Sequence, residues 1–130
     1  MIVDTSAFMA ILLKEPEADV FLAKLLDAEH IRVSAATVVE LYIVAVGRSG
    51  AEAAQDVDLL LARCGAEIIP LRQDQVEIAR NAILTFGKGR HRAALNFGDC
   101  FSYALTKAYM EPLLYKGSDF AHTDIVSALA

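Results

Sequence analysis

The sequence predicts an α/β fold with a small, mostly parallel central sheet of four to five strands between layers of helices. Short apolar runs of three or four residues alternate along the chain with longer segments of helical periodicity. Strands that are joined through helices pair in parallel by right-handed crossovers. With 130 residues, 55% of them hydrophobic, the chain is expected to bury its own core as a single domain over residues 1–130.

In the first half of the chain, capping and turn residues separate the predicted elements. These elements are a strand over 1–3, a helix over 5–13, a helix from Pro16 to Leu26, a strand over 31–33 and a helix from Ala35 to Val46. Thr5 or Ser6 satisfies the first-turn donors of the first helix. Pro16 suits a first helical turn, and its acidic neighbours favour the positive end of the helix dipole. Ser34 caps the third helix.

In the second half, glycine and proline mark the boundaries. The predicted elements are a helix over 51–64, a strand over 67–70, helices over 74–86 and 98–110, a strand over 113–115 and a helix or turn from Ala121 onward. The break at Gly47 to Gly50 precedes the first of these helices, Pro70 closes the third strand, and Pro112 precedes the fourth. The stretch from Gly87 to Phe97 is expected to be a loop.

Charge and cysteine content limit the possible classes. The longest stretch without charge, Thr5 to Leu13, is too short to cross a membrane, and no secretory signal is recognisable. Cys64 and Cys100 have no CxxC spacing, which predicts free thiols in a reducing cytoplasm. The net charge of −5 disfavours a nucleic-acid partner. Cation binding by some acids and the basic run Lys88 to Arg92 leave that question open.

Four acidic residues, Asp4, Glu40, Asp99 and Asp119, stand where a solitary carboxylate is hard to justify. Asp4 and Asp119 follow predicted strands, where sites form in parallel sheets, and the other two lie on helices that are able to reach the same crevice. Gathered at 4 Å, each pair would repel by about 4 kcal/mol at an effective dielectric of about 20. A divalent cation would offset this repulsion, and oxygen-only ligands suit Mg²⁺ or Mn²⁺.

Each acid alone also has a structural explanation. Asp4 and Asp99 suit helix N-termini, and Asp119 suits a Gly-Ser-Asp turn. Glu40, in an apolar stretch, suits a buried ion pair with an arginine. Its candidate partners are Arg32 and Arg48. No single cap explains the whole set.

The segments around these acids resemble the PIN-domain ribonucleases, and within them the VapC toxins of bacterial toxin–antitoxin pairs. The matching segments are Val3-Asp4-Thr5-Ser6-Ala7, Val38-Val39-Glu40, Leu95-Asn96-Phe97-Gly98-Asp99-Cys100 and Lys116-Gly117-Ser118-Asp119-Phe120 with Thr123-Asp124. The resemblance covers essentially the whole chain and implies a PIN-like three-layer α/β/α fold. It also implies an Mg²⁺- or Mn²⁺-dependent endoribonuclease, usually a homodimer, that a cognate antitoxin holds inactive.

The resemblance assigns the catalytic and metal-binding roles to Asp4, Glu40, Asp99 and Asp119. It places an auxiliary hydroxyl at Thr5 or Ser6. Many relatives carry a second acid where this chain has Ser118, so Asp124 is kept as an auxiliary carboxylate. The predicted contacts to RNA phosphates are Arg90, Arg92 and Lys116.

The leading hypothesis is hydrolysis of an RNA phosphodiester by metal-activated water in single-stranded regions. One alternative is a phosphatase with Asp4 as nucleophile, although such enzymes commonly carry a second acid where this chain has Ser6. Another is a non-catalytic module that binds nucleic acid or a partner. The apolar helix surface that includes Phe8, Ile11, Leu12 and Leu13 suits an antitoxin helix, although core packing explains most such residues.

Overall fold

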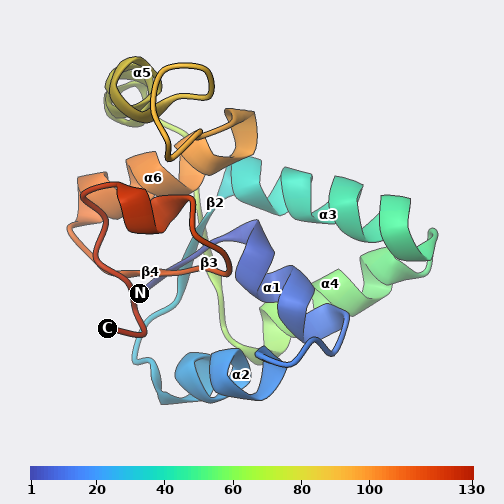
Figure 1. The fold of residues 1–130 in the computed structure, drawn as a ribbon. Helices are drawn as coiled ribbons and strands as arrows, with labels where there is room; N and C mark the ends of the chain where they lie inside the picture. Colours follow the sequence, from blue (N-terminus) through green and yellow to red (C-terminus); the bar gives the residue numbers. More distant parts are fainter.

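The computed structural model describes residues 1–130 and contains a four-stranded sheet between helical layers (Figure 1). The strands are β1 (Ile2–Val3), β2 (Arg32–Ser34), β3 (Glu67–Ile69) and β4 (Leu113–Leu114). Their order across the sheet is β3-β2-β1-β4, and all three pairings are parallel. The predicted α/β class and parallel pairing are confirmed.

Six α-helices and one short 3₁₀ turn connect and flank these strands. They are α1 (Thr5–Leu12), α2 (Ala18–Asp27), α3 (Ala35–Ser49), α4 (Ala53–Arg63), α5 (Gln73–Phe86), α6 (Phe97–Tyr109) and η1 (Phe120–His122). Every predicted helix before Pro112 is present, with ends that differ by one or two residues at most positions. No helix is long and apolar enough to cross a membrane.

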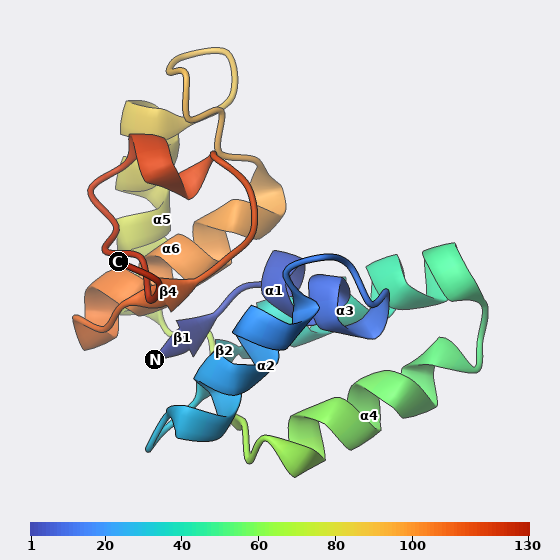
Figure 2. The ribbon, with the colours of Figure 1, turned by 60° about the horizontal axis from the view of Figure 1, so that its bottom comes forward.

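Alternation along the strands divides the core into two apolar clusters. In β1, Val3 joins the cluster formed with α1 to α4, whereas Ile2 joins the cluster formed with α5, α6 and η1. Both side chains are fully buried, as expected for a parallel sheet that is covered on both faces. Figure 2 shows α5 and α6 on one side of the strands and α1, α2 and α4 on the other.

Two strands pass into helices without an intervening loop. Asp4 follows β1 and caps α1, because its side chain accepts a hydrogen bond from the Ser6 N–H. Ser34 ends β2 and caps α3 by accepting from the Ala36 N–H. These caps fix the first turns of both helices just beyond the carboxyl ends of neighbouring strands.

The C-terminal segment forms no helix beyond the single turn η1. The Thr123 side chain bonds to the Phe120 carbonyl and accepts from the Ile125 N–H, and such local bonds compete with a helix. Leu113 then pairs with residues of the returning chain and forms a parallel bridge with Ser127. This bridge marks the place of a fifth strand. The third strand also ends one residue early, before Pro70, which has no N–H to donate.

Candidate active site

Asp4 is the most deeply buried of the four acids, with 4% of its surface exposed. One carboxylate oxygen accepts from the N–H and the hydroxyl of Ser6, at 3.0 and 2.6 Å. The other accepts from the hydroxyl of Ser102 on α6, at 2.6 Å. Because a buried carboxylate needs such donors, Asp4 is held in one orientation at the end of β1.

Glu40 reaches from α3 to the first turn of α6. Its Oε2 lies over Gly98, where a Cβ would stand only 1.6 Å away, and its Oε1 accepts from the Thr5 hydroxyl. Burial raises the pKa of Glu40, the Thr5 bond opposes this effect, and the charge of Asp4 adds to it. Glu40 therefore stands between the starts of α1 and α6.

Asp99 forms a capping box at the start of α6. Its carboxylate accepts from the Asn96 N–H, and its own N–H donates to the Asn96 side chain, both at 3.0 Å. The pKa of Asp99 is raised to about 6. Burial is the largest cause, and the bond from Asn96 opposes it. The charges of Asp4, Asp119 and Glu40 raise it further, so the four acids act on one another.

Asp119 lies in the exposed segment after β4, directly before η1. Its side chain makes no capping hydrogen bond. The segment is fixed on both sides, because the Lys116 N–H donates to the Ser6 hydroxyl at 3.0 Å and Phe120 is buried. Asp119 is thus the most accessible acid of the cluster.

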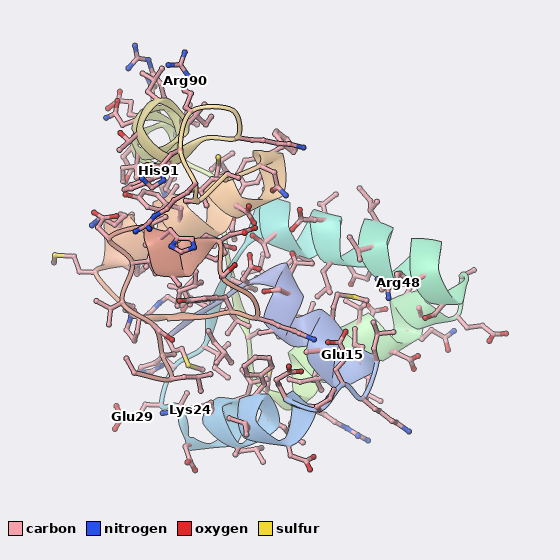
Figure 3. All side chains as sticks on the ribbon, viewed as in Figure 1. Glu15, Lys24, Glu29, Arg48, Arg90 and His91 are labelled. Carbon is pink, nitrogen blue, oxygen red and sulfur yellow. The ribbon has the colours of Figure 1, made fainter.

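The ion pairs of the molecule lie elsewhere. They join Arg32 with Glu67 and Glu111, Lys116 with Glu15 and Glu17, Lys107 with Asp124, and the amino group of Met1 with Glu111. Arg48 lies at the far end of α3 (Figure 3). Neither arginine therefore pairs with Glu40. The four acids form a cluster without a basic partner, in which only hydrogen bonds oppose burial and mutual repulsion.

The donor set fits a hard divalent cation, because it consists of carboxylate and hydroxyl oxygens. With the side chains as they stand, no three acidic, cysteine or histidine groups are close enough to share one ion. Each of Asp4, Glu40 and Asp99 is turned toward its own hydrogen-bond donors. For the three acids to share an ion, Glu40 and Asp99 would have to rotate toward Asp4, which its own donors hold in place.

The predicted basic contacts lie apart from the acids. Lys116 directs its ammonium group to Glu15 and Glu17 on the side of α1, which disagrees with its predicted role at RNA phosphates. Arg90 and Arg92 are exposed in the loop after α5, and Figure 3 shows Arg90 at the outer edge of the molecule. Of the three predicted contacts, these two arginines form no ion pair.

Asp124 belongs to a different contact. It accepts from the Tyr103 hydroxyl at 2.7 Å and from Lys107 at 2.8 Å. Burial alone would raise the pKa of Asp124, but the bonds from Lys107 and Tyr103 lower it below its ordinary value. Asp124 therefore fastens the C-terminal segment to α6.

Sequence reasoning missed two residues of the site. Ser102 holds Asp4, and Gly98 leaves the space that Glu40 occupies. Both lie within one helical turn of Asp99. Helical spacing offered a signal for Ser102, because residues three apart share a face, but a serine among apolar residues has no distinctive chemistry by itself.

A family model for the PIN domain matches residues 1–126. The chain belongs to the PIN-domain family. The VapC ribonuclease Mb0640 of Mycobacterium bovis and ribonuclease VapC30 of Mycobacterium tuberculosis are each 47% identical to it over 128 residues, covering 98% of this chain and 97% of the relative. Ribonuclease VapC of Mycolicibacterium smegmatis is 42% identical over 127 residues, covering 98% of both chains. Within the PIN-domain family, this chain groups with the VapC ribonucleases.

Solved structures of PIN-domain toxins share the architecture. VapC20 of Mycobacterium tuberculosis, described as a sarcin-ricin loop cleaving toxin, superposes with a TM-score of 0.78 at 17% identity over 98% of this chain and 97% of that one. A toxin–antitoxin complex from Klebsiella pneumoniae gives 0.74 at 18% identity over 99% and 97%. At these identities the likeness concerns the fold, and it agrees with the three-layer PIN arrangement.

Proposed function

We propose that this chain is an endoribonuclease toxin whose active site is the cluster of Asp4, Glu40, Asp99 and Asp119. The observation that carries this proposal is the pKa of Asp99, which burial and the three other acids raise to about 6. Perturbed carboxylates gathered in one crevice are typical of catalytic centres. Relatives that span nearly the whole chain are named ribonucleases. We assign the activity to residues 1–130 acting as one PIN-like domain.

Mg²⁺ or Mn²⁺ is the proposed cofactor, held by Asp4, Glu40 and Asp99, with Asp119 completing a second position or orienting water. A bound divalent ion would lower the pKa of water and stabilise negative charge that develops on phosphate oxygens. The hydroxyls of Thr5 and Ser6 orient Glu40 and Asp4 through the bonds described above. Arg90 and Arg92, in the loop that precedes α6, would bind RNA phosphates at a distance from the acids.

The phosphatase alternative finds no support in the geometry. Enzymes with a nucleophilic aspartate commonly carry a second acid two residues further along the chain. The position two residues on carries Ser6, which donates to Asp4 instead of supplying a second acid. A non-catalytic binding module does not explain why four acids are gathered without a basic partner.

An antitoxin is the proposed protein partner, and a groove on the molecule suits it. The groove has a volume of about 590 Å³ and lies between α1, α2 and α4 (Figure 2). Its apolar lining consists of Ile11, Leu12, Leu22, Leu25, Leu26, Leu59, Leu60 and Cys64. An amphipathic helix binds such a groove through its apolar face. Phe8, on the same helix α1, is fully buried core.

A homodimer is proposed through the outer faces of α3 and α5. Large apolar side chains are exposed there at helical spacing, namely Val39, Ile43 and Val46 on α3 and Val76, Ile83 and Leu84 on α5. Exposed apolar faces of this kind mark protein interfaces. We also propose a cytoplasmic location, since Cys64 and Cys100 are free thiols.

The test uses asparagine, which caps a helix as well as aspartate does. Asp4→Asn and Asp99→Asn are expected to fold normally and to lose cleavage of a structured RNA in Mg²⁺ or Mn²⁺, by at least about a hundredfold. Asp19→Asn, an acid in the first turn of α2 outside the cluster, is the matched control and should cleave normally. If both site variants cleave RNA as fast as the wild type, the acid cluster is not the active site.

A further inference from the structure

A chain of buried hydroxyl groups connects the segments that carry the four acids. Ser102 on α6 is 1% exposed and donates to Asp4 at 2.6 Å. Its oxygen lies 3.4 Å from the hydroxyl of Thr37, a fully buried residue of α3. On the other side of Asp4, the Ser6 hydroxyl donates to the carboxylate and accepts from the Lys116 N–H.

The number of protons that each group is able to donate determines the direction of these hydrogen bonds. An ionised carboxylate only accepts hydrogen bonds, and a hydroxyl has a single proton to donate. Ser102 donates its only proton to Asp4, so Thr37 must be the donor in the bond between Thr37 and Ser102. Ser6 likewise donates its proton to Asp4 and accepts a hydrogen bond from the Lys116 N–H. Every hydrogen bond of the chain therefore points toward Asp4.

Three members of the chain lie three residues from another acid. The pairs are Thr37 with Glu40, Ser102 with Asp99, and Lys116 with Asp119. On α3 and α6, this spacing places hydroxyl and acid on neighbouring positions of one helical face. The bond from the Ser102 hydroxyl to Asp4 thus also fixes the distance between β1 and α6, whose first turn carries Asp99.

We propose that Ser102 is a positioning residue that orients the Asp4 carboxylate and sets its spacing from Asp99 for divalent-cation binding. This role rests on the proposed function. Residues that hydrogen-bond to metal ligands hold those ligands in orientation, and their loss weakens metal binding by about ten- to a hundredfold. Ser102 itself touches neither substrate nor ion in this role, because its proton is directed to Asp4.

The test measures Mn²⁺ binding by calorimetry, with no RNA present, on the full chain and its variants. Ser102→Ala is expected to bind Mn²⁺ about ten- to a hundredfold more weakly than the wild type. Its kcat for RNA cleavage at saturating Mn²⁺ should fall while KM for RNA stays within twofold. Ser102→Cys, which keeps the volume but donates poorly, should behave in the same way, and it serves if the alanine variant fails to fold.

Thr106→Val is the matched control. Thr106 lies one turn further along α6, is 3% exposed, and its hydroxyl has no hydrogen-bond partner. Its loss should leave Mn²⁺ affinity and kcat within twofold of the wild type. If the Ser102 variants match this control while Asp4→Asn loses Mn²⁺ binding, the positioning role is wrong and the proposed active site stands. If the wild type binds no Mn²⁺, both proposals fail.

Discussion

At the scale of single residues, Gly98 determines the position of Glu40. A side chain at Gly98 would occupy the place of Oε2 of Glu40. Gly98→Ala is therefore expected to displace Glu40 and to reduce RNA cleavage by at least about tenfold, while the melting temperature stays near that of the wild type. Glu40 is a flexible side chain and is able to move at little cost.

Gly47→Ala is the control for that substitution. Gly47 also lies in a helix, α3, and nothing stands within 4 Å of a Cβ there. This change should leave cleavage unaffected and stabilise the protein by about 0.5–1 kcal/mol through the lower entropy of the unfolded chain. Full cleavage by Gly98→Ala would show that Glu40 has no fixed place in the mechanism.

Asp99 makes the stability of the metal-free protein depend on pH. Its pKa is raised to about 6 from an ordinary value of 3.8, so the folded state binds this proton more tightly than the unfolded chain. The ionised Asp99 side chain therefore lowers the free energy of unfolding above pH 6, and this destabilisation disappears as the pH falls toward 4. Asp99→Asn should thus stabilise the protein at pH 7.5 by an amount on the order of 1 kcal/mol after solvent screening. Urea unfolding in EDTA at pH 7.5 and 5 measures this, and an equal gain at both pH values would contradict it.

At the scale of elements, α6 carries the site on its first turn and the C-terminal segment on its later turns. Asp124→Ala removes the bonds from Tyr103 and Lys107 and should destabilise the protein by about 0.5–1.5 kcal/mol. Because the pKa of Asp124 is lowered, this contribution is present above its unfolded pKa and is lost as the pH falls below it. RNA cleavage should persist under stabilising conditions. Loss of cleavage with an intact fold would show that Asp124 acts in the active site.

The sequence predicted the helices and strands better than it predicted the contacts between them. Periodicity and caps located the strands and helices before Pro112, because both faces of the sheet are buried and their patterns are strong. Of the two alternatives for the C-terminal segment, helix or turn, the helix is wrong, since Thr123 and Leu113 bond the backbone in other ways. The four acids stood out from their apolar surroundings, and the family resemblance supplied their catalytic roles. The roles of Ser102 and Gly98 depend on contacts between distant segments, which no local pattern encodes.

At the scale of the whole molecule, two apolar surfaces are formed by different elements, the groove by α1, α2 and α4 and the other surface by α3 and α5. Leu26 is 72% exposed at the groove, and Ile43 is 67% exposed on α3. Leu26→Arg should weaken binding of the neighbouring gene's product by at least about tenfold while the protein remains dimeric. Ile43→Arg should give a monomer in light scattering and still bind that partner. Each variant is the control for the other, and identical behaviour of the two would refute separate interfaces.

The parallel sheet also sets an order of events during synthesis. The groove is built from residues between Ile11 and Cys64, whereas Asp119 takes its place only after β4 has paired with β1, which joins Leu113 to Ile2. Closing so long a loop is slow in folding. The residues that line the groove therefore leave the ribosome before Asp119, and the four acids come together only when β4 has paired.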